Sequence, residues 1–163
     1  MSKSSRETII AWRMLGDREE AEDVAQDAFV RVFLRIHTWR REGAFSTWLY
    51  RVVANLCFDR LRRPGRRGGL SARAGKSSSE LTNPMPEATK SESSIETAVV
   101  VQQILGRISP KLRAVLVMRE VEGLDYRDIA SALRIPLGTV RSRLSAARLA
   151  FRDLYLQCTS TAR

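Results

Sequence analysis

A cluster of arginine and hydroxyl side chains lies near the C-terminus, between positions 137 and 148. Apolar residues recur there at Val140, Leu144 and Ala147, which is the spacing of a helix buried on one side. The remaining face carries Arg141, Ser142, Arg143, Ser145 and Arg148. Arginine can donate two hydrogen bonds to the edge of a guanine, so an exposed helix face of this composition suits the major groove of DNA. The alternative is an ordinary helical hairpin with a solvated basic face.

The residues before this cluster indicate a short helix followed by a tight turn. Asp125 can accept hydrogen bonds from the amides of a first helical turn, and Asp128 stands where a capping box has its second member. Pro136 ends the helix, because proline cannot continue it and restrains the residue before it. A short helix, a turn and a second helix form a helix-turn-helix, whose second helix enters the major groove. The segment from Leu124 to Leu154 is therefore predicted to bind DNA.

Aromatic and basic residues form a second group of interest at positions 39 to 43, with the sequence WRREG. Proteins stack unpaired bases on aromatic rings beside basic side chains, so this predicted loop suits a single strand. A helix is expected to follow at 46–63. Its exposed side would carry Arg51, Asn55, Asp59, Arg60 and Arg62. The alternative is that Trp39, Trp48 and Tyr50 belong to the core.

Acidic residues concentrate at the start of the second predicted helix, although the chain as a whole carries a net charge of +10. They are Asp17, Glu19, Glu20, Glu22 and Asp23. The positive end of a helix dipole stabilises such residues, which is one explanation of the cluster. The other is a protein partner, because so acidic a surface repels DNA. The apolar face of this helix is expected to continue through Val24, Ala28, Val32 and Ile36, with Phe29 and Phe33 alongside.

Composition indicates a nucleic-acid partner and gives no sign of a metal or cofactor. The chain has 163 residues and a pI near 10.7, and nucleic acid is the commonest partner of so basic a protein. Cys57 and Cys158 lack a CxxC partner and His37 is the only histidine, so no zinc site, disulfide or cofactor is expected. Cys57 is expected in the core. We find no membrane-span pattern, signal-peptide core or small-molecule site, and therefore expect a cytoplasmic protein.

The apolar pattern predicts an all-α protein of two small helical domains joined by a flexible linker. Gly, Ser, Pro and charged residues replace that pattern over positions 64–92, a stretch longer than ordinary loops. The expected domains are residues 1–63 and 94–163, with residues 64–93 between them. Ser46 and Ser109 are predicted to cap the helices that follow them, and the second of these helices is predicted to run to Glu122.

Four segments of the sequence resemble the extracytoplasmic-function sigma factors of bacterial RNA polymerase. They are AEDVAQDAFVRVF (21–33), AFSTWLYRVVANLCFDRLRR (44–63), ISPKLRAVLVMREVEGLDYRDIA (108–130) and IPLGTVRSRLSAAR (135–148). They follow the family's order and cover most of both predicted domains. The resemblance implies a promoter-specificity subunit that is not an enzyme. Its partners would be core polymerase, double-stranded promoter DNA, the single non-template strand of the minus-10 element and an anti-sigma factor.

The resemblance also assigns roles to individual positions. Core polymerase would dock on Asp23, Gln26, Asp27 and Phe29, which supplies a reason for the acidic cluster. The minus-10 element would be opened and held by Trp39, Arg40, Arg41, Gly43, Trp48, Arg51, Asn55 and Arg62. Asn55 would contact a flipped base. The minus-35 element would be read by Thr139, Arg141, Ser142, Arg143, Ser145 and Arg148.

The sequence departs from the family's pattern at three places. Relatives have a longer segment before the position of Asp17, so the first domain is expected to be short at its N-terminus. Ser145 and Ala146 are small where relatives often carry bulky or basic groups, so fewer bases would be read directly. Arg134 occupies a turn position where relatives often place glycine, and a positive φ is costly for arginine.

Two other classes of protein are compatible with part of this pattern. A stand-alone repressor or activator could use the same helix-turn-helix, but the acidic cluster, the aromatic-basic loop and the long linker would then lack a purpose. Binding to core polymerase would distinguish it from a sigma factor. A nucleic-acid enzyme would need a metal-binding acid cluster or a nucleophile beside its base. The acid cluster lies in the first turns of a helix with no histidine near it, so no enzyme is expected.

Overall fold

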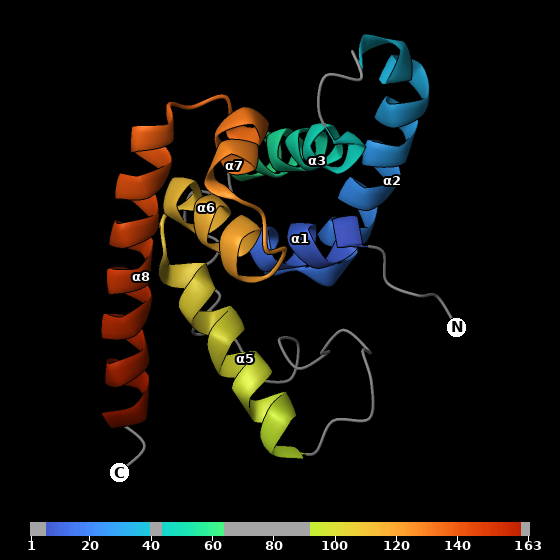
Figure 1. Cartoon of the computed structure of the whole chain (residues 1–163). Helices are drawn as coiled ribbons and strands as arrows, with labels where there is room; N and C mark the ends of the chain where they lie inside the picture. The colour runs from blue at the N-terminus through green and yellow to red at the C-terminus, as the bar shows by residue number, and fades with distance from the viewer. Residues whose placement is uncertain (1–5, 40–43, 64–91, 161–163) are drawn as a thin grey trace.

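The computed structural model describes residues 6–39, 44–63 and 92–160. This part of the chain consists of helices and short connections and contains no strand, so the predicted all-α class is confirmed (Figure 1). Its elements are α1 (Arg6–Leu15), α2 (Arg18–Arg35), the 3-10 helix η1 (Ile36–Thr38), α3 (Phe45–Arg62), α5 (Glu92–Arg107), α6 (Pro110–Glu120), α7 (Tyr126–Leu133) and α8 (Leu137–Ser160). None of these described helices is long and apolar enough to cross a membrane.

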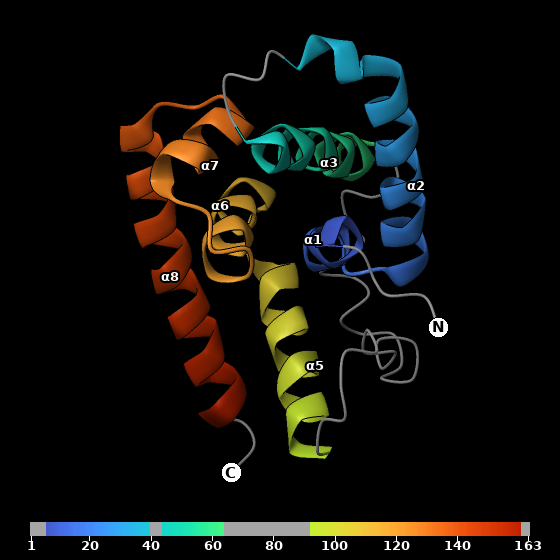
Figure 2. The ribbon, with the colours of Figure 1, turned by 45° about the vertical axis from the view of Figure 1, so that its right-hand side comes forward.

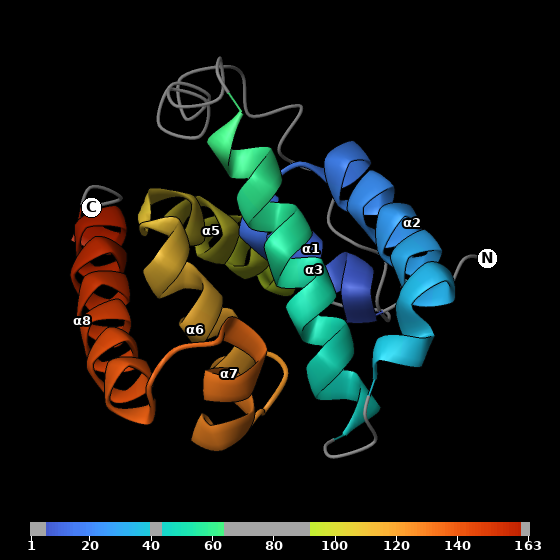
Figure 3. The same cartoon turned by 90° about the horizontal axis from the view of Figure 1, so that it is seen from above.

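The helices form two groups that pack against each other. The first group is α1 to α3, and the second is α5 to α8, in which α7 and α8 form the helix-turn-helix. Helix α1 contacts α5 and α6, while α3 contacts α6 and α7. Figure 3 shows α3 running between α2 and the second group, with its N-terminal end beside α7. In Figure 2 the two groups meet along α1 and α3.

One hydrophobic core joins the two groups. Its largest fully buried side chains include Ile10, Met14, Val24 and Val53 from the first group and Ile104, Val115, Met118, Ile129 and Leu144 from the second. Full burial of one such side chain contributes about 1.5–3 kcal/mol, so the shared core is the main source of stability for the contact between the groups. Cys57 lies in this core, as predicted from its apolar neighbours.

Two aspartates, Asp17 and Asp125, cap helices that begin at or next to the predicted positions. Asp17 precedes α2, and its carboxylate accepts a hydrogen bond from the amide of Glu20 at 3.0 Å. Asp125 precedes α7 and accepts from the amide of Asp128 at 2.7 Å. Each bond satisfies one of the backbone donors that a first turn leaves without an intrahelical partner. The predicted start of the helix-turn-helix is therefore confirmed.

Two predicted helix ends differ from the structure, and a third agrees in position. The prediction of Ser46 as a cap is wrong, because α3 begins at Phe45 and its capping position is Ala44. Ser109 is the capping residue of α6 and Pro110 opens the helix, as predicted, although the Ser109 side chain makes no capping hydrogen bond. Helix α6 ends at Glu120, two residues before the predicted end, because Gly123 adopts a φ of 68° and the chain turns back there.

The turn between α7 and α8 is left-handed at Arg134, although an arginine at this position made that conformation doubtful from the sequence. Arg134 lies in the left-handed region, with a φ of 53° and a ψ of 50°. Its amide and that of Ile135 both donate to the carbonyl of Ala130, the second at 3.1 Å. A residue with a side chain loses roughly 1–2 kcal/mol in this conformation.

Candidate nucleic-acid and partner interfaces

The N-terminal half of α8 presents a polar face on the side opposite to the core. Val140, Leu144 and Ala147 are buried beneath it. Of the predicted minus-35 residues, Arg141, Ser142, Ser145 and Arg148 are exposed, whereas Thr139 and Arg143 are half-buried. The Ser142 hydroxyl donates to the Thr139 carbonyl at 3.1 Å, which fixes its position on this face. An exposed helix of this kind has the dimensions that a major groove admits.

Arg148 differs from the other residues of this face because it forms a close ion pair within the protein. Its Nη2 and Nε donate to the Oε1 atom of Glu120 in α6, at 2.6 and 3.0 Å. The hydrogen bond to Glu120 raises the pKa of Arg148 above its ordinary value. A DNA phosphate would therefore have to share this guanidinium with Glu120, whereas Arg141 is two turns nearer the start of the helix.

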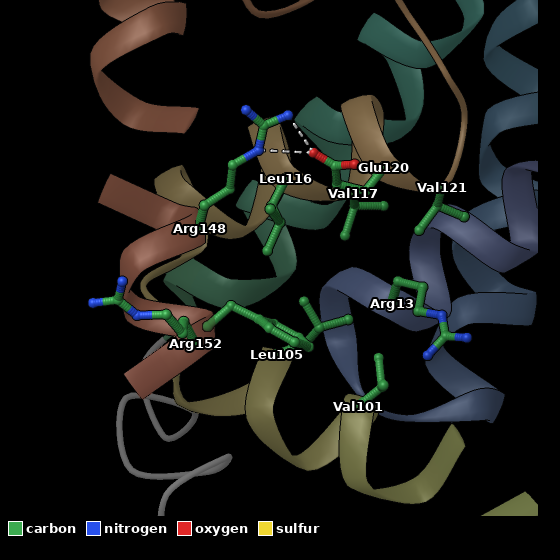
Figure 4. A pocket seen from close by; sticks show the side chains of 10 residues that line it. Arg13, Val101, Leu105, Leu116, Val117, Glu120, Val121, Arg148 and Arg152 are labelled. Atoms are coloured by element: carbon green, nitrogen blue, oxygen red, sulfur yellow. Dashed lines mark hydrogen bonds and ion pairs between the residues drawn. The ribbon is translucent and has the colours of Figure 1, made fainter. Parts of the chain in front are cut away.

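A groove of about 430 Å³ lies between α1, α5, α6 and α8 (Figure 4). Its walls are largely apolar and include Val101, Leu105, Leu116, Val117 and Phe151. The arginines at its rim come from both helix groups, since Arg13 belongs to α1 while Arg148 and Arg152 belong to α8. The sequence does not predict this groove, because its residues come from four helices whose packing the apolar pattern does not specify.

The first half of α3 lies against α7 of the helix-turn-helix. Arg51, a predicted minus-10 residue, donates from Nη2 to the Ser131 carbonyl at 2.8 Å and to the Ser131 hydroxyl at 3.2 Å. The Thr47 hydroxyl and the Asp128 carboxylate are 3.3 Å apart. Burial and then the nearby charge of Arg134 lower the pKa of Arg51. The structure thus places one predicted DNA contact inside a contact between the two helix groups.

The other predicted minus-10 residues have varied surroundings. Asn55 is exposed, and exposed Arg62 pairs with Asp59 of its own helix. Trp39 and Trp48 are half-buried and both pack on Phe45, with ring centroids 5.3 and 5.7 Å apart. The two alternatives were stacking on unpaired bases and a place in the core. Both tryptophan rings are partly packed and partly open to solvent, so the structure is compatible with both. Arg40, Arg41 and Gly43 lie outside the described residues.

The acids predicted to dock polymerase are bound to an arginine of α3. Asp27 accepts from Arg60 at 2.8 Å, and Asp23 is 3.7 Å from the same guanidinium. The Arg60 side chain is only 15% exposed, while the two carboxylates are more than half exposed. Gln26 is also exposed on α2. The acidic face therefore carries its own counter-ion, which the sequence did not reveal because Arg60 belongs to another helix.

The C-terminal half of α2 is apolar on its exposed surface. The prediction that Phe29, Phe33 and Ile36 lie along the buried face is wrong, since they are 57%, 84% and 50% exposed. Val30 and Leu34 are also exposed, at 59% and 62%. Helix α2 has 18 residues and spans about 27 Å, and in Figure 1 its second half continues beyond α3. Five exposed apolar side chains gathered on one helix and its C-terminal end indicate a binding site for another protein.

The described residues include no group of histidines, cysteines and acids that could hold a metal ion. Burial raises the pKa of Cys57 to about 12, so its thiol is protonated at neutral pH and unreactive.

Comparison with known proteins identifies two sigma-factor regions. Residues 9–67 match the model of sigma-70 region 2, and residues 98–151 match that of sigma-70 region 4. The ECF RNA polymerase sigma factor SigE of Mycolicibacterium smegmatis is 34% identical over 88% of this chain and 55% of that protein. The RNA polymerase sigma-H factor of Pseudomonas aeruginosa is 36% identical over 83% and 73%. SigW of Bacillus subtilis is 35% identical over 88% and 79%.

The fold itself resembles that of a solved sigma factor. The structure of RpoE from Bartonella quintana, in complex with the anti-sigma factor NepR, superposes with a TM-score of 0.70 at 21% sequence identity. The match covers 90% of this chain and 88% of that one. The chain spans about half the length of SigE from M. smegmatis and about three quarters of the other two relatives. With both regions matched in order, this chain belongs to the extracytoplasmic-function sigma factors of the sigma-70 family.

Proposed function

We propose that this chain binds core RNA polymerase, recognises the minus-35 and minus-10 promoter elements and helps to open the DNA for transcription initiation. The chain provides promoter recognition and helps to open the strands, while polymerase performs the catalysis, so the chain itself is not an enzyme. It acts in the bacterial cytoplasm. Residues 1–63, which contain most of sigma-70 region 2, form the domain that binds the minus-10 element and core polymerase. Residues 94–163 form the minus-35 domain, with the linker 64–93 between them.

The observation that carries this proposal is the exposed face of α2. Three apolar side chains that a free-standing DNA-binding protein would bury, Val30, Phe33 and Leu34, are more than half exposed there. Gln26 and Asp27 stand beside them on the same helix, so the surface has an apolar centre and an acidic edge. Such a surface fits a large protein partner of complementary charge rather than DNA. A sigma factor needs this partner, and a stand-alone repressor does not.

Promoter recognition is divided between two helices in this proposal. Arg141 and Ser142 of α8 read base edges of the minus-35 element, because they are the exposed polar residues nearest the start of that helix. Asn55 of α3 contacts an unstacked base of the minus-10 element, since an amide can both donate and accept. Trp39 provides a partly open ring on which a base can stack.

An anti-sigma factor is the regulatory partner in this proposal. The solved relative from B. quintana is described as a complex of a sigma factor with the anti-sigma factor NepR. The apolar surface on α2 supports the same kind of partner here, because a protein that covers Phe33 and its neighbours would compete directly with polymerase.

The proposal is tested by run-off transcription with core polymerase on a library of random promoters. We expect transcripts only when the chain is added, and the selected templates should share two conserved elements. Phe33→Ser should abolish co-purification with core polymerase, while Leu156→Ser, which also replaces an exposed apolar side chain but on α8, should leave it unchanged. If the chain binds duplex DNA but does not bind core polymerase and does not support transcription, it is a stand-alone regulator instead.

A further inference from the structure

We propose that the groove between α1, α5, α6 and α8 binds a small amphiphilic anion, namely a single-chain carboxylate of about ten to fourteen carbon atoms. The apolar walls would hold the chain, and Arg13 would bind the carboxylate. This inference does not rest on the proposed function, because Arg13 and the apolar wall residues are assigned neither to polymerase nor to DNA. It adds a small-molecule site for which the sequence shows no pattern.

The size and the lining of the groove suit an apolar chain (Figure 4). Its volume of about 430 Å³ falls within the roughly 300–1,000 Å³ of ligand-binding pockets. A group the size of a water molecule occupies about 30 Å³, and a methylene group is of similar size, so there is room for roughly fourteen such groups. The chain would cover apolar surface of half-buried Val101 and Phe151 and of exposed Val121, and this transfer out of water is favourable.

Arg13 is a half-buried cation at one end of the groove. Figure 4 shows its guanidinium near Val101, on the opposite side of the groove from Arg148. Its Nη1 donates to the amide oxygen of Gln102 at a long 3.4 Å, and its guanidinium carbon lies 4.6 Å from the centre of the Trp12 ring. Among the described residues, no carboxylate forms an ion pair with Arg13, and no group accepts a hydrogen bond from its buried Nε.

A partly buried cation without an acidic partner favours the binding of an anion. Burial lowers the pKa of Arg13, because surroundings of low polarity disfavour the charged form. A carboxylate supplies the missing charge, and its two oxygens can accept two parallel hydrogen bonds from one guanidinium. The apolar walls next to Arg13 keep water from such a pair and so strengthen it. Arg13 and the walls therefore suit the two ends of one amphiphile.

The other two arginines of the rim already have acidic partners. Arg148 donates to Glu120 at 2.6 Å, and Arg152 lies 3.3 Å from Asp153. The carboxylate is therefore expected at Arg13, with the chain running across the groove toward α8. A head group with a single charge fits best, because one guanidinium lacks an acidic partner. A phosphate monoester carries about −1.5 to −2 charges near neutral pH and would leave excess charge beside the apolar walls.

The test is isothermal titration calorimetry of the full chain with dodecanoate, below the concentration at which dodecanoate forms micelles. We expect saturable binding of one molecule per chain. Hexanoate should bind more weakly by about tenfold or more, because its shorter chain covers less apolar surface. Dodecanol should also bind more weakly by about tenfold or more, because it lacks the charge that Arg13 would bind. Equal binding of dodecanol and dodecanoate would refute an anion site, and tighter binding of dodecyl phosphate would overturn the choice of a carboxylate.

Two variants and a matched control assign the site. Arg13→Gln removes the cation, and Val101→Phe fills the space of the chain while it keeps Arg13. Each should weaken dodecanoate binding by about tenfold or more. Arg107→Gln changes an exposed arginine of α5 outside the groove and should leave the binding nearly unchanged. A cooperative thermal transition shows that each variant is folded, and dodecanoate should raise its midpoint only for the wild type and Arg107→Gln.

Adsorption of dodecanoate on the exposed apolar side chains of α2 is the main competing outcome. If Phe33→Ser lowers the binding as much as Val101→Phe does, or if many molecules bind without saturation, the ligand is not in the groove and the proposal is refuted. Unchanged binding by Val101→Phe overturns it even if Arg13→Gln does not fold. No binding at all also overturns it and leaves the groove to a second copy or another protein. Run-off transcription without dodecanoate tests the proposed function separately, so either proposal can fail alone.

Discussion

Replacing Arg113 by methionine should destabilise the whole molecule by about 3 kcal/mol. The Arg113 side chain is 3% exposed and donates to three carbonyl groups. These belong to Met14, to Gly106 at 3.0 Å and to Ile108 at 2.8 Å. Each buried carbonyl left without a donor costs about 1–3 kcal/mol, so the loss of all three costs about 3–9 kcal/mol.

The removal of a buried charge offsets part of that cost. Burial lowers the pKa of Arg113 from 12.5 to about 10, so the guanidinium is less stable as a cation here than in water by roughly 3 kcal/mol. Methionine fills similar space without this penalty. The two effects have opposite signs, and their difference centres near 3 kcal/mol. For a chain of this length that corresponds to a fall in Tm of about 6–12 °C.

The assay is urea unfolding followed by circular dichroism at 222 nm and by tryptophan fluorescence. All three tryptophans belong to the first helix group, so fluorescence reports its unfolding separately. Since Arg113 joins α6 to α1, the two signals should coincide for the wild-type chain and separate for Arg113→Met. Lys111→Met, an exposed change on the same helix, should alter stability by less than about 0.5 kcal/mol. A variant as stable as the wild type would refute the reasoning.

Three further predictions concern recognition, melting and pH. In duplex-binding assays, Arg141→Ala should weaken binding to the preferred minus-35 sequence by about 1–3 kcal/mol and flatten the preference at one or two bases. Arg148→Ala should weaken binding to all sequences alike. If Arg141→Ala also weakened binding to all sequences equally, Arg141 would be a phosphate contact. Asn55→Ala should slow open-complex formation on duplex promoters and recover partly on a pre-melted template, as read by permanganate reactivity of unpaired thymines; unchanged reactivity on duplex would remove Asn55 from the mechanism. Burial, together with the hydrogen bond to Glu122, raises the pKa of Tyr50 to about 12 against the opposing effect of Arg6. The raised pKa adds stability that is complete below pH 10 and lost as the pH rises through 12, so urea stability should fall over that window in the wild type and less in Tyr50→Phe.

The sequence predicted the elements that depend on neighbouring residues. The helix-turn-helix and its Asp125 cap follow from local rules, because each involves residues no more than a few positions apart. Burial of Val140, Leu144 and Ala147 followed from helical periodicity. The exposed residues of the minus-35 face were found for the same reason, since the polar face is the complement of the buried one.

Features that depend on packing between distant helices were not predictable in this way. The apolar residues Phe29 and Phe33 have the periodicity of a buried face, and only the length of α2 relative to its neighbours leaves them exposed. The contact of Arg51 with Ser131 joins residues 80 positions apart. Nothing in either local sequence indicates that these residues meet. The aromatic residues of the minus-10 region were ambiguous for a similar reason, because partial burial of Trp48 depends on where the next element lies.

The ion pairs of Arg60 change how the acidic face of α2 behaves as a binding surface. Asp23 and Asp27 already have a cationic partner, so a basic protein that docks there replaces Arg60 instead of neutralising bare charge. Binding is then an exchange of one counter-ion for another. Fewer dissolved ions are released than the number of carboxylates suggests, and the affinity should depend only weakly on salt concentration. Non-specific basic proteins gain little from such a face, which leaves the neighbouring apolar side chains to decide which partner is bound.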